Sequence, residues 1–302
     1  MSTINGYEVN TEWIIVRTGS WALAKKNGKV FFIKRMSIPC YPNDPTLYPP
    51  ESETTIRIKA ECEEFEKEFK KKIEAVKAAS KRCGTIVPPL DLLRVKSKYY
   101  FASEAVEGEH LAPEDVCNLK QEERCVIMKD LAEALAALEA EGIVHSEIES
   151  YNVIIVKKDG RFRPMLVGFD DCFFAGRPPE AETMPGSPEY YSPEMAKYIA
   201  ERDASLGNKI NSATDVYSLG ILFYYYQTGK KLLPKKDSAY DFPFQASFDD
   251  LDVSAASGND KFLCLLEKML APKPEDRPKP KDIPAMIDKI MGRARHPRLK
   301  PL

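Results

Sequence analysis

The sequence predicts an α+β fold in two parts, a smaller strand-rich part followed by a larger helical one. Residues 13–35 contain short apolar runs separated by turn signals, a pattern typical of strands. Residues 55–82 carry apolar side chains at intervals of three and four, as a helix does. Helical patterns dominate after Gly108, and a chain of 302 residues is longer than one average domain.

The first part, residues 1–106, begins with an apolar strand at 13–16. Asn27-Gly28 is a strong two-residue hairpin signal before a second strand at 29–34. The following loop excludes both helix and central strand because it contains five prolines, Pro39, Pro42, Pro45, Pro49 and Pro50. The helix at 55–82 then presents one apolar face, formed by Cys62, Phe65, Phe69, Ile73 and Val76. Strands at 86–95 and 99–106 complete this part.

The second part, residues 107–302, is predicted to be mostly helical. The apolar periodicity and the turn signals place five helices, at residues 122–141, 193–201, 215–228, 260–270 and 283–291. The chain ends in a short basic tail at 293–300. We interpret this tail as a solvated end, because four positive side chains beside prolines make a poor nucleic-acid surface.

The composition argues against several classes of function. Forty-four Lys and Arg nearly balance 46 Asp and Glu, so no overall field attracts nucleic acid or an anionic membrane. The seven cysteines are scattered, odd in number and never spaced as CxxC, which argues against a disulfide framework and a zinc site. The first residues lack a signal-peptide pattern, and the longest apolar stretch, 216–226, is too short to span a bilayer. We therefore predict a cytoplasmic protein with neither nucleic acid nor membrane as a partner.

Five sequence blocks in the second part occur in a specific order. They are His145-Ser-Glu-Ile-Glu-Ser-Tyr-Asn152, Val167-Gly-Phe-Asp170, Gly186-Ser-Pro-Glu-Tyr-Tyr-Ser-Pro-Glu194, Thr214-Asp-Val-Tyr-Ser-Leu-Gly220 and Pro274-Glu-Asp-Arg277. With them the chain resembles the protein kinase superfamily, specifically its bacterial serine/threonine kinase-like group. The resemblance covers nearly the whole chain, apart from the proline-rich loop and the last dozen residues. It implies a bilobal kinase fold.

The resemblance extends upstream to segments that bind ATP in kinases. Phe31-Phe-Ile-Lys34 is similar to the strand V-A-I-K, and Thr18-Gly-Ser-Trp21 is similar to a degraded glycine-rich loop. Residues 98–108 resemble the last strand and the hinge. The implied nucleotide contacts are Lys34, Gly19, Glu104, Val106, Asn152 and Ile154.

Other residues oppose nucleotide binding. Phe32 stands where kinases usually keep an alanine under the adenine ring, and Ala24 is the small neighbour that would make room for it. Arg17 and Ala22 replace two loop glycines, so the backbone approaches phosphate less freely. ATP is thus the candidate ligand, and no cofactor is a firm expectation.

The resemblance also requires a glutamate on the helix at 55–82 to pair with Lys34. Glu66 fits the apolar spacing best, because Phe69 and Ile73 follow it. Three other carboxylates on the same helix remain alternatives, namely Glu63, Glu64 and Glu68.

Three positions of the implied phosphoryl-transfer machinery have lost their usual residues. Glu147 replaces the aspartate that accepts the hydroxyl proton, and a displacement of about 1 Å can cost roughly a hundredfold in rate. Glu149 replaces a lysine near the γ-phosphate, and a unit charge pair about 4 Å apart is worth roughly 4 kcal/mol at an effective dielectric near 20. Reversing the sign therefore changes the balance by up to about 8 kcal/mol, unless Glu149 turns into solvent. Gly168 replaces the metal-binding aspartate and offers no ligand.

Asn152 and Asp170 are the remaining candidates for holding Mg²⁺. Asp170 lies two residues beyond Gly168, or roughly 6.6 Å along an extended chain. Mg²⁺ requires oxygens at about 2.0–2.1 Å in near-octahedral geometry, so rescue by Asp170 needs a backbone movement.

Four further positions are interpreted as structural. The resemblance gives His145 and Asp215 the role of braces for the catalytic loop, and it pairs Glu194 with Arg277. Ser146 replaces the arginine that would receive an activating phosphate, so control by phosphorylation of residues 168–194 is not expected.

Together these features favour a degenerate kinase, or pseudokinase, that acts as a non-catalytic scaffold or allosteric regulator bound to another protein. One alternative is a weak or atypical transferase that uses Glu147 and Asp170. A nucleotide sensor without turnover is the other.

Overall fold

The computed structural model describes residues 2–16 and 18–292 of the chain. Its described residues form two compact units, one from the parts of the chain before residue 79 and at 87–107, and the other from residues 79–86 and 108–292. The sequence placed this division after residue 106. The segment 79–86, which includes the end of the long helix, belongs with the second unit instead. The basic tail at 293–300 lies outside the described residues.

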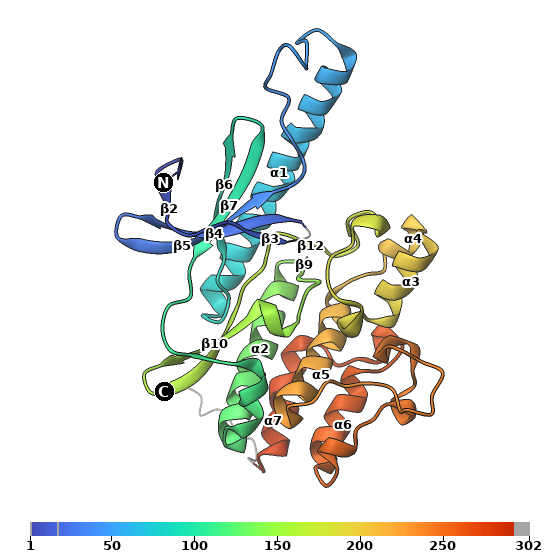
Figure 1. The fold of residues 1–302 in the computed structure, drawn as a ribbon. Helices are drawn as coiled ribbons and strands as arrows, with labels where there is room; N and C mark the ends of the chain where they lie inside the picture. Colours follow the sequence, from blue (N-terminus) through green and yellow to red (C-terminus); the bar gives the residue numbers. More distant parts are fainter. Residues whose placement is uncertain (1, 17, 293–302) are drawn as a thin grey trace, which may run out of the picture. The chain divides into compact units, whose positions relative to one another are not determined.

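The first unit is built on an antiparallel sheet (Figure 1). Its strands are β1 Ser2–Ile4, β2 Tyr7–Val9, β3 Ile14–Val16, β4 Gly19–Lys26, β5 Lys29–Met36, β6 Pro89–Val95 and β7 Lys98–Glu104. They run in the order β1-β2-β4-β5-β7-β6, and β3 pairs with β4 beside β2. The hairpin predicted at Asn27-Gly28 is confirmed, because β4 and β5 pair up to Lys26 and Lys29 on either side of it. The short strands β1 and β2 were not predicted.

Each face of this sheet has its own apolar core. Ile33 and Ala102 point to the face that β1 and β2 cover with buried side chains. The other face packs against the long helix α1, Glu53–Arg82, whose Phe69 contacts Phe101 of β7. Figure 1 shows the β6–β7 hairpin running beside α1. Because strand residues alternate between faces, Phe32 and Lys34 lie on the helix side of β5.

The second unit consists mainly of helices. They are α2 Gln121–Ala140, α3 Pro193–Glu201, α4 Ala204–Gly207, α5 Ser212–Thr228, α6 Asp260–Met269 and α7 Ile283–Ile290. Five of the six agree with the sequence prediction to within a few residues. Helix α5 is buried along most of its length, and Asn211 caps its start by accepting a hydrogen bond from the Ala213 amide. This buried helix holds the residues that brace the candidate site.

Five short strands of the second unit bring the candidate residues together. They are β8 His110–Leu111, β9 Ile143–Val144, β10 Val153–Lys158, β11 Arg161–Leu166 and β12 Phe173–Phe174. Strand β9 pairs with β12, and β10 pairs with β11. The segment 145–152 connects β9 to β10, and the segment 167–172 connects β11 to β12. Because these strands are paired, the two segments lie next to each other at both of their ends. These segments carry most of the predicted catalytic and metal-binding positions.

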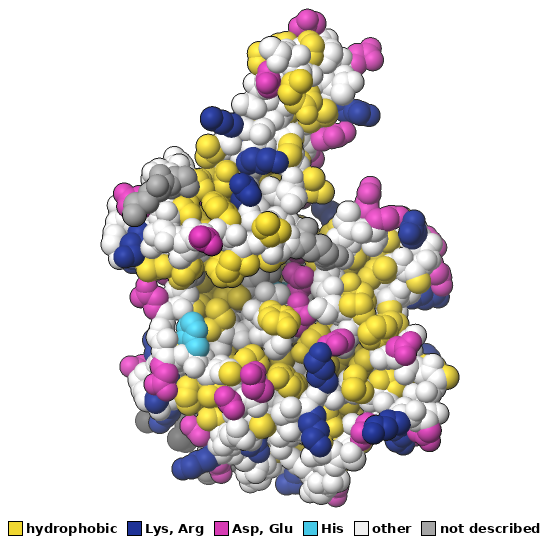
Figure 2. Space-filling view, in the orientation of Figure 1, with side chains coloured by type: hydrophobic (Ala, Val, Ile, Leu, Met, Phe, Trp, Pro, Cys, Tyr) yellow, Lys and Arg dark blue, Asp and Glu magenta, His cyan; other side chains and the backbone are white. Residues whose placement is uncertain are grey.

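The described helices include none with the length and apolar composition needed to cross a bilayer. Basic and acidic side chains are interspersed on the face drawn in Figure 2, without an extended area of one sign. All seven cysteines are thiols in the structure.

Candidate functional site

Asp215 fixes the backbone at the start of the catalytic loop, residues 145–152. Its two carboxylate oxygens accept hydrogen bonds from the amides of His145 and Ser146, both at 2.8 Å. The carboxyl group lies in the first turn of α5 and is almost completely buried. Burial raises the pKa of Asp215 to about 7, against the opposing effect of the two amide hydrogen bonds. The brace that the sequence suggested for this position is therefore present as two direct contacts.

The imidazole of His145 connects the catalytic loop to the segment 167–172. Nε2 lies 2.9 Å from the carbonyl oxygen of Val167, and Nδ1 accepts a hydrogen bond from the Glu147 amide at 3.3 Å. The ring also meets Phe169 edge-on, with the ring centroids 4.8 Å apart. Complete burial lowers the pKa of His145 to about 4, so the ring is neutral at neutral pH. These contacts assign the proton to Nε2, because Val167 offers only an acceptor and Nδ1 is itself an acceptor.

Glu147, at the position of the catalytic base, directs its carboxylate to its own chain. Oε1 accepts a hydrogen bond from the Gly186 amide at 2.9 Å. The Glu147 carbonyl oxygen in turn accepts one from Asn152 Nδ2 at 3.0 Å. Because glutamate is one methylene longer than aspartate, its carboxylate reaches the segment that begins at Gly186.

Glu149, at the position of the lysine, is 8% exposed. Its Oε2 accepts a hydrogen bond from Ser187 Oγ at 2.7 Å. The alternative raised from the sequence, a side chain turned into solvent, is therefore wrong. A buried carboxylate is stable only where donors satisfy it, and the Ser187 hydroxyl is one such donor.

A side chain at residue 168 would be strained and would crowd Asn152. Its backbone has φ = +81°, a region that side chains rarely adopt. A Cβ at this position would lie 2.4 Å from Asn152 Oδ1 and 2.7 Å from Asn152 Cγ. The amide of Asn152 therefore occupies the space next to the position where kinases have a metal-binding aspartate.

Asp170 is a buried carboxyl group that follows the buried Phe169. Within residues 2–16 and 18–292, no three His, Cys, Asp or Glu side chains gather closely enough to hold a metal ion. Asn152, the other predicted ligand, donates through Nδ2 to Glu147 and lies against Gly168 through Oδ1. The assignment of Mg²⁺ to Asn152 and Asp170 remains a prediction, and we derive no chemical step through the ion.

In the first unit, Lys34 is 9% exposed and stands in the middle of the sheet. It pairs across the strands with Trp21 of β4 and Phe101 of β7. Gly19, the one glycine kept from the predicted loop, lies so close to β5 that a Cβ would be 2.0 Å from the Arg35 carbonyl oxygen. Packing between strands therefore accounts for this glycine without any nucleotide.

The remaining predicted nucleotide contacts lie on both units. Glu104 ends β7, and its carboxylate pairs with Lys29 at 3.0 Å. Val106 follows Glu104 in the first unit, and Ile154 lies on β10 of the second, opposite Met165. Their assignment to a nucleotide remains a prediction.

Glu66 has partners other than the predicted Lys34. Its Oε1 accepts a hydrogen bond from the Tyr99 hydroxyl at 2.8 Å and lies 3.1 Å from Arg94 Nε. Lys70 Nζ is 3.9 Å from its other oxygen. Burial raises the pKa of the Tyr99 hydroxyl, so this group keeps its proton and donates it to Glu66. This part of α1 faces β6 and β7 through Tyr99 and Arg94, and the pairing of Glu66 with Lys34 remains a prediction.

Phe32 does not use the room that Ala24 offers. Ala24 points to the opposite face of the sheet, into the core beneath β1 and β2. Phe32 instead stacks on Trp21, with ring centroids 5.4 Å apart and an interplanar angle of 30°. The sheet face that carries Lys34 is therefore lined by two large aromatic rings. Trp21 was quoted in the loop motif, but its contact with Phe32 was not predicted.

Comparison with known proteins places this geometry in a family. The sequence profile described as "protein kinase domain" matches residues 55–286, which is most of the chain. The chain belongs to the protein kinase family. The matched region starts after β5, so it leaves out Gly19 and Lys34.

Similar kinases are bacterial and eukaryotic. The serine/threonine-protein kinase PkaA of Streptomyces coelicolor is 30% identical over 155 residues, which are 51% of this chain and 26% of PkaA. Serine/threonine-protein kinase 17A of Oryctolagus cuniculus is 25% identical over 185 residues, or 59% of this chain and 43% of that protein. The matched region thus spans less than half of either relative.

Solved kinase structures share the fold. The kinase domain of PknI from Mycobacterium tuberculosis superposes with a TM-score of 0.61, covering 96% of this chain and 98% of that domain. The sequence identity is 19%, so the likeness shows the fold alone. This confirms the bilobal kinase fold predicted from the sequence.

The pair of Glu194 and Arg277 is a structural feature of the kinase fold in this chain. Arg277 Nη1 and Nη2 donate to the two carboxylate oxygens at 2.7 and 2.8 Å. Burial pushes the pKa of Glu194 upwards, but the hydrogen bonds and the charge of Arg277 outweigh it and leave the pKa below its usual value. The ion pair predicted from the sequence is therefore present, with Arg277 buried and Glu194 slightly exposed.

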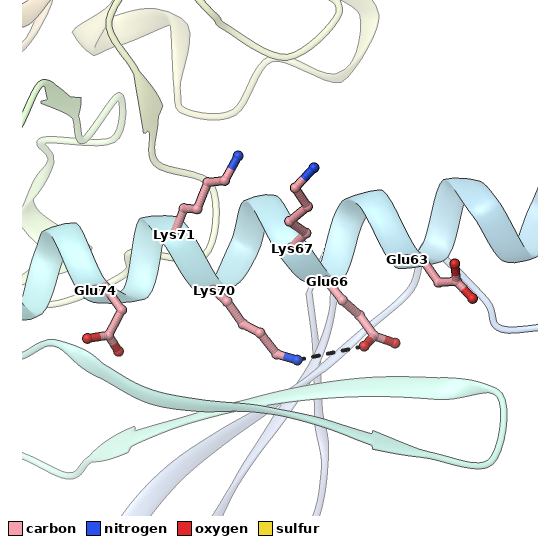
Figure 3. A pocket seen from close by; sticks show the side chains of 6 residues that line it. All are labelled: Glu63, Glu66, Lys67, Lys70, Lys71 and Glu74. Carbon is pink, nitrogen blue, oxygen red and sulfur yellow. Dashed lines mark ion pairs between the residues drawn. The ribbon is translucent and has the colours of Figure 1, made fainter.

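A shallow depression runs along α1. It is lined by Glu63, Glu66, Lys67, Lys70, Lys71 and Glu74. Figure 3 shows Lys67 and Lys71 pointing to one side of the helix and Glu66, Lys70 and Glu74 to the other. Such charges on one helix surface pair with one another at i,i+3 and i,i+4, as Lys70 and Glu66 do, and they define no binding site.

Sequence reasoning missed two residues that determine the chemistry of the site. Gly186 and Ser187 are the donors to Glu147 and Glu149, although both had been quoted in a kinase motif. A signal was available, because replacing a lysine by glutamate calls for a hydrogen-bond donor, and the serine hydroxyl can donate. The carboxylates of Glu147 and Glu149 are therefore held by hydrogen-bond donors of the same chain.

Proposed function

We propose that this protein is a pseudokinase that works as a non-catalytic scaffold or allosteric regulator of another protein. The single observation that carries the proposal is the contact between Gly168 and Asn152. Phosphoryl transfer needs Mg²⁺ to neutralise the charge of the transferred group, and a ligand at this position is the usual means. Here an aspartate could return only if the Asn152 amide, which now fills the space next to Gly168, moved away.

The electrostatics around the catalytic loop support the same proposal. Glu147 and Glu149 place two carboxylates where kinases keep one carboxylate and one ammonium group. Glu149 is buried and therefore poorly screened by solvent, so its charge opposes an incoming phosphate. The resulting penalty is of the order of several kcal/mol, which corresponds to several decades of rate.

The aromatic pair Trp21 and Phe32 argues against tight nucleotide binding. Both rings lie on the sheet face of Lys34, and Phe32 also meets Phe101 edge-on with centroids 6.0 Å apart. A purine that stacked on this face would have to displace rings that already contact each other. We therefore infer weak nucleotide binding or none.

A kinase fold that has lost phosphoryl transfer still has surfaces that can bind other proteins. We therefore propose that the partner is another protein. A reducing compartment such as the cytoplasm suits seven cysteines that remain thiols. The matched region covers only part of each relative, so we propose the partner and the compartment for the protein as a whole.

Thermal unfolding of the whole chain with ATP or ADP, each with and without Mg²⁺, tests the proposed function. We expect no nucleotide-dependent shift and no transfer of phosphate from labelled ATP to a general protein substrate. A shift that is independent of Mg²⁺ would instead favour a nucleotide sensor. A Mg²⁺-dependent shift together with ordinary kinase turnover would overturn the proposal in favour of a transferase that uses Glu147 and Asp170.

A further inference from the structure

The carboxylates of Glu147 and Glu149 converge on one short segment, Gly186–Ser187. Glu147 Oε1 is 2.9 Å from the Gly186 amide nitrogen, and Glu149 Oε2 is 2.7 Å from Ser187 Oγ. Both glutamates come from the catalytic loop, and both donors come from the segment that precedes α3. Two adjacent donors thus meet two carboxylates that are two residues apart.

The segment is also fixed from its other end. Tyr191 donates its hydroxyl to the Gly186 carbonyl oxygen at 3.0 Å. Ser218 Oγ on the buried helix α5 donates to the Tyr190 carbonyl oxygen at 2.7 Å. Gly186 is therefore held through both its amide and its carbonyl group.

The catalytic loop on the opposite side is equally constrained. Asp215 holds the amides of His145 and Ser146, and Asn152 Nδ2 holds the carbonyl oxygen of Glu147. The side chain of Glu149 is buried, and hydrogen bonds to a charged acceptor are about twice as strong as neutral ones. The two contacts to Gly186 and Ser187 thus join two rigid backbones.

From this geometry we propose that Glu147 and Glu149 are positioning residues that form a carboxylate clamp, closing the segment 186–191 onto the catalytic loop. The clamp commits the carboxylate at the base position to the Gly186 amide of its own chain. It also keeps the neighbouring surface, where Lys231 pairs with Glu189 at 2.8 Å, in one conformation for a partner. The inference rests on the proposed function, since it gives a role to two residues whose transfer role is proposed to be lost.

Amide hydrogen exchange in the whole chain, resolved at Gly186 by NMR, tests the clamp without ATP. We expect Glu147→Ala to raise the exchange rate of the Gly186 amide at least tenfold, and Glu147→Gln, which retains an acceptor oxygen, to leave it within about threefold of the natural protein. Glu189→Gln is the matched control, because this carboxylate lies in the same segment and pairs with Lys231 instead. Unchanged exchange in Glu147→Ala, or an equal rise in Glu189→Gln, would overturn the proposal.

The serine gives a second and milder test that does not depend on folding of Glu147→Ala. Ser187→Ala removes one oxygen and should also raise exchange at Gly186, whereas Ser187→Thr keeps the hydroxyl and should restore protection. Ser187→Asp should open the segment further, because it places a like charge against the buried Glu149. Equal exchange in the alanine and threonine variants would refute the clamp, whereas turnover of ATP by the natural protein would refute only the proposed function.

Discussion

Asn152 Oδ1 stands where a side chain at residue 168 would begin, 2.4 Å from the position of a Cβ on Gly168. No real side chain tolerates that separation, so one residue must move before the other can change. The absence of an aspartate at residue 168 and the position of the Asn152 amide therefore depend on each other. Restoring aspartate at 168 alone would not restore a kinase site.

The first prediction concerns substitution at this position. Gly168→Ala should lower the free energy of unfolding by about 3–4 kcal/mol, combining the cost of a left-handed backbone with that of crowding. Gly160→Ala is the matched control, since Gly160 has φ = +73° and no atom within 4 Å of a Cβ. The control substitution should lower the free energy of unfolding by about 1–2 kcal/mol. Urea denaturation of both variants measures the difference.

A double variant isolates the steric part of this prediction. Gly168→Ala should lose more free energy of unfolding than the Gly160→Ala control. Adding Asn152→Ala should recover much of this extra loss, because the amide that crowds the Cβ is gone. Additive losses in the double variant would show that Asn152 is not the obstacle.

The sequence predicted those parts of the fold that rest on long or well-marked patterns. Helix α1 follows from its repeated apolar residues, and the β4–β5 hairpin follows from Asn27-Gly28. Strands β1 and β2 were missed because three residues each give too short an alternation to detect. Asn5-Gly6 between them was the one available signal.

The site was predicted less completely, because the sequence gives the identity of each residue but not the direction in which its side chain points. It identified Gly168 as a lost ligand, yet the place of the Asn152 amide depends on its bond to the Glu147 carbonyl oxygen. For Glu66, the spacing gave the helix but not the rotation of the helix over the sheet. That rotation is set by the packing of Cys62 and Phe69 on β6 and β7.

The second prediction concerns the aromatic pair beside Lys34. Phe32→Ala should let the whole protein bind ADP, because it removes the ring that Trp21 stacks on and exposes the Lys34 face. We expect a rise in Tm of at least about 2 °C at saturating ADP, compared with no rise in the natural protein. Phe31→Ala is the control, since Phe31 fills the opposite face of the same strand. An equal response in the two variants would refute the role of Phe32.

The third prediction tests whether Glu66 fastens α1 to the sheet. Removing its carboxylate leaves the Tyr99 hydroxyl without its acceptor, which costs about 1–3 kcal/mol for a buried group. A double-mutant cycle with Glu66→Ala and Tyr99→Phe should give a coupling energy of about 1 kcal/mol, measured by urea denaturation. The parallel cycle with Lys34→Met should give a coupling near zero. A larger coupling to Lys34 than to Tyr99 would restore the pairing first expected from the sequence.

The last prediction follows from the buried imidazole of His145. Its pKa falls from 6.5 to about 4 on folding, so the unfolded chain binds more protons between these values and His145 lowers stability as the pH falls. Between pH 7 and pH 5 this contribution is about 2 kcal/mol. Asp215 acts in the opposite direction, because burial raises its pKa to about 7 and its ionisation in the unfolded chain lowers stability as the pH rises. The effect of His145 is therefore visible only in a comparison of variants.

His145→Gln removes the titrating ring and leaves Asp215 in place. On going from pH 7 to pH 5, the free energy of unfolding of this variant should improve by about 2 kcal/mol relative to the natural protein. His110→Gln, at an exposed histidine, is the control variant. Parallel curves for His145→Gln and the natural protein would mean that His145 is not held neutral, and the assignment of its proton to Nε2 would fail with it.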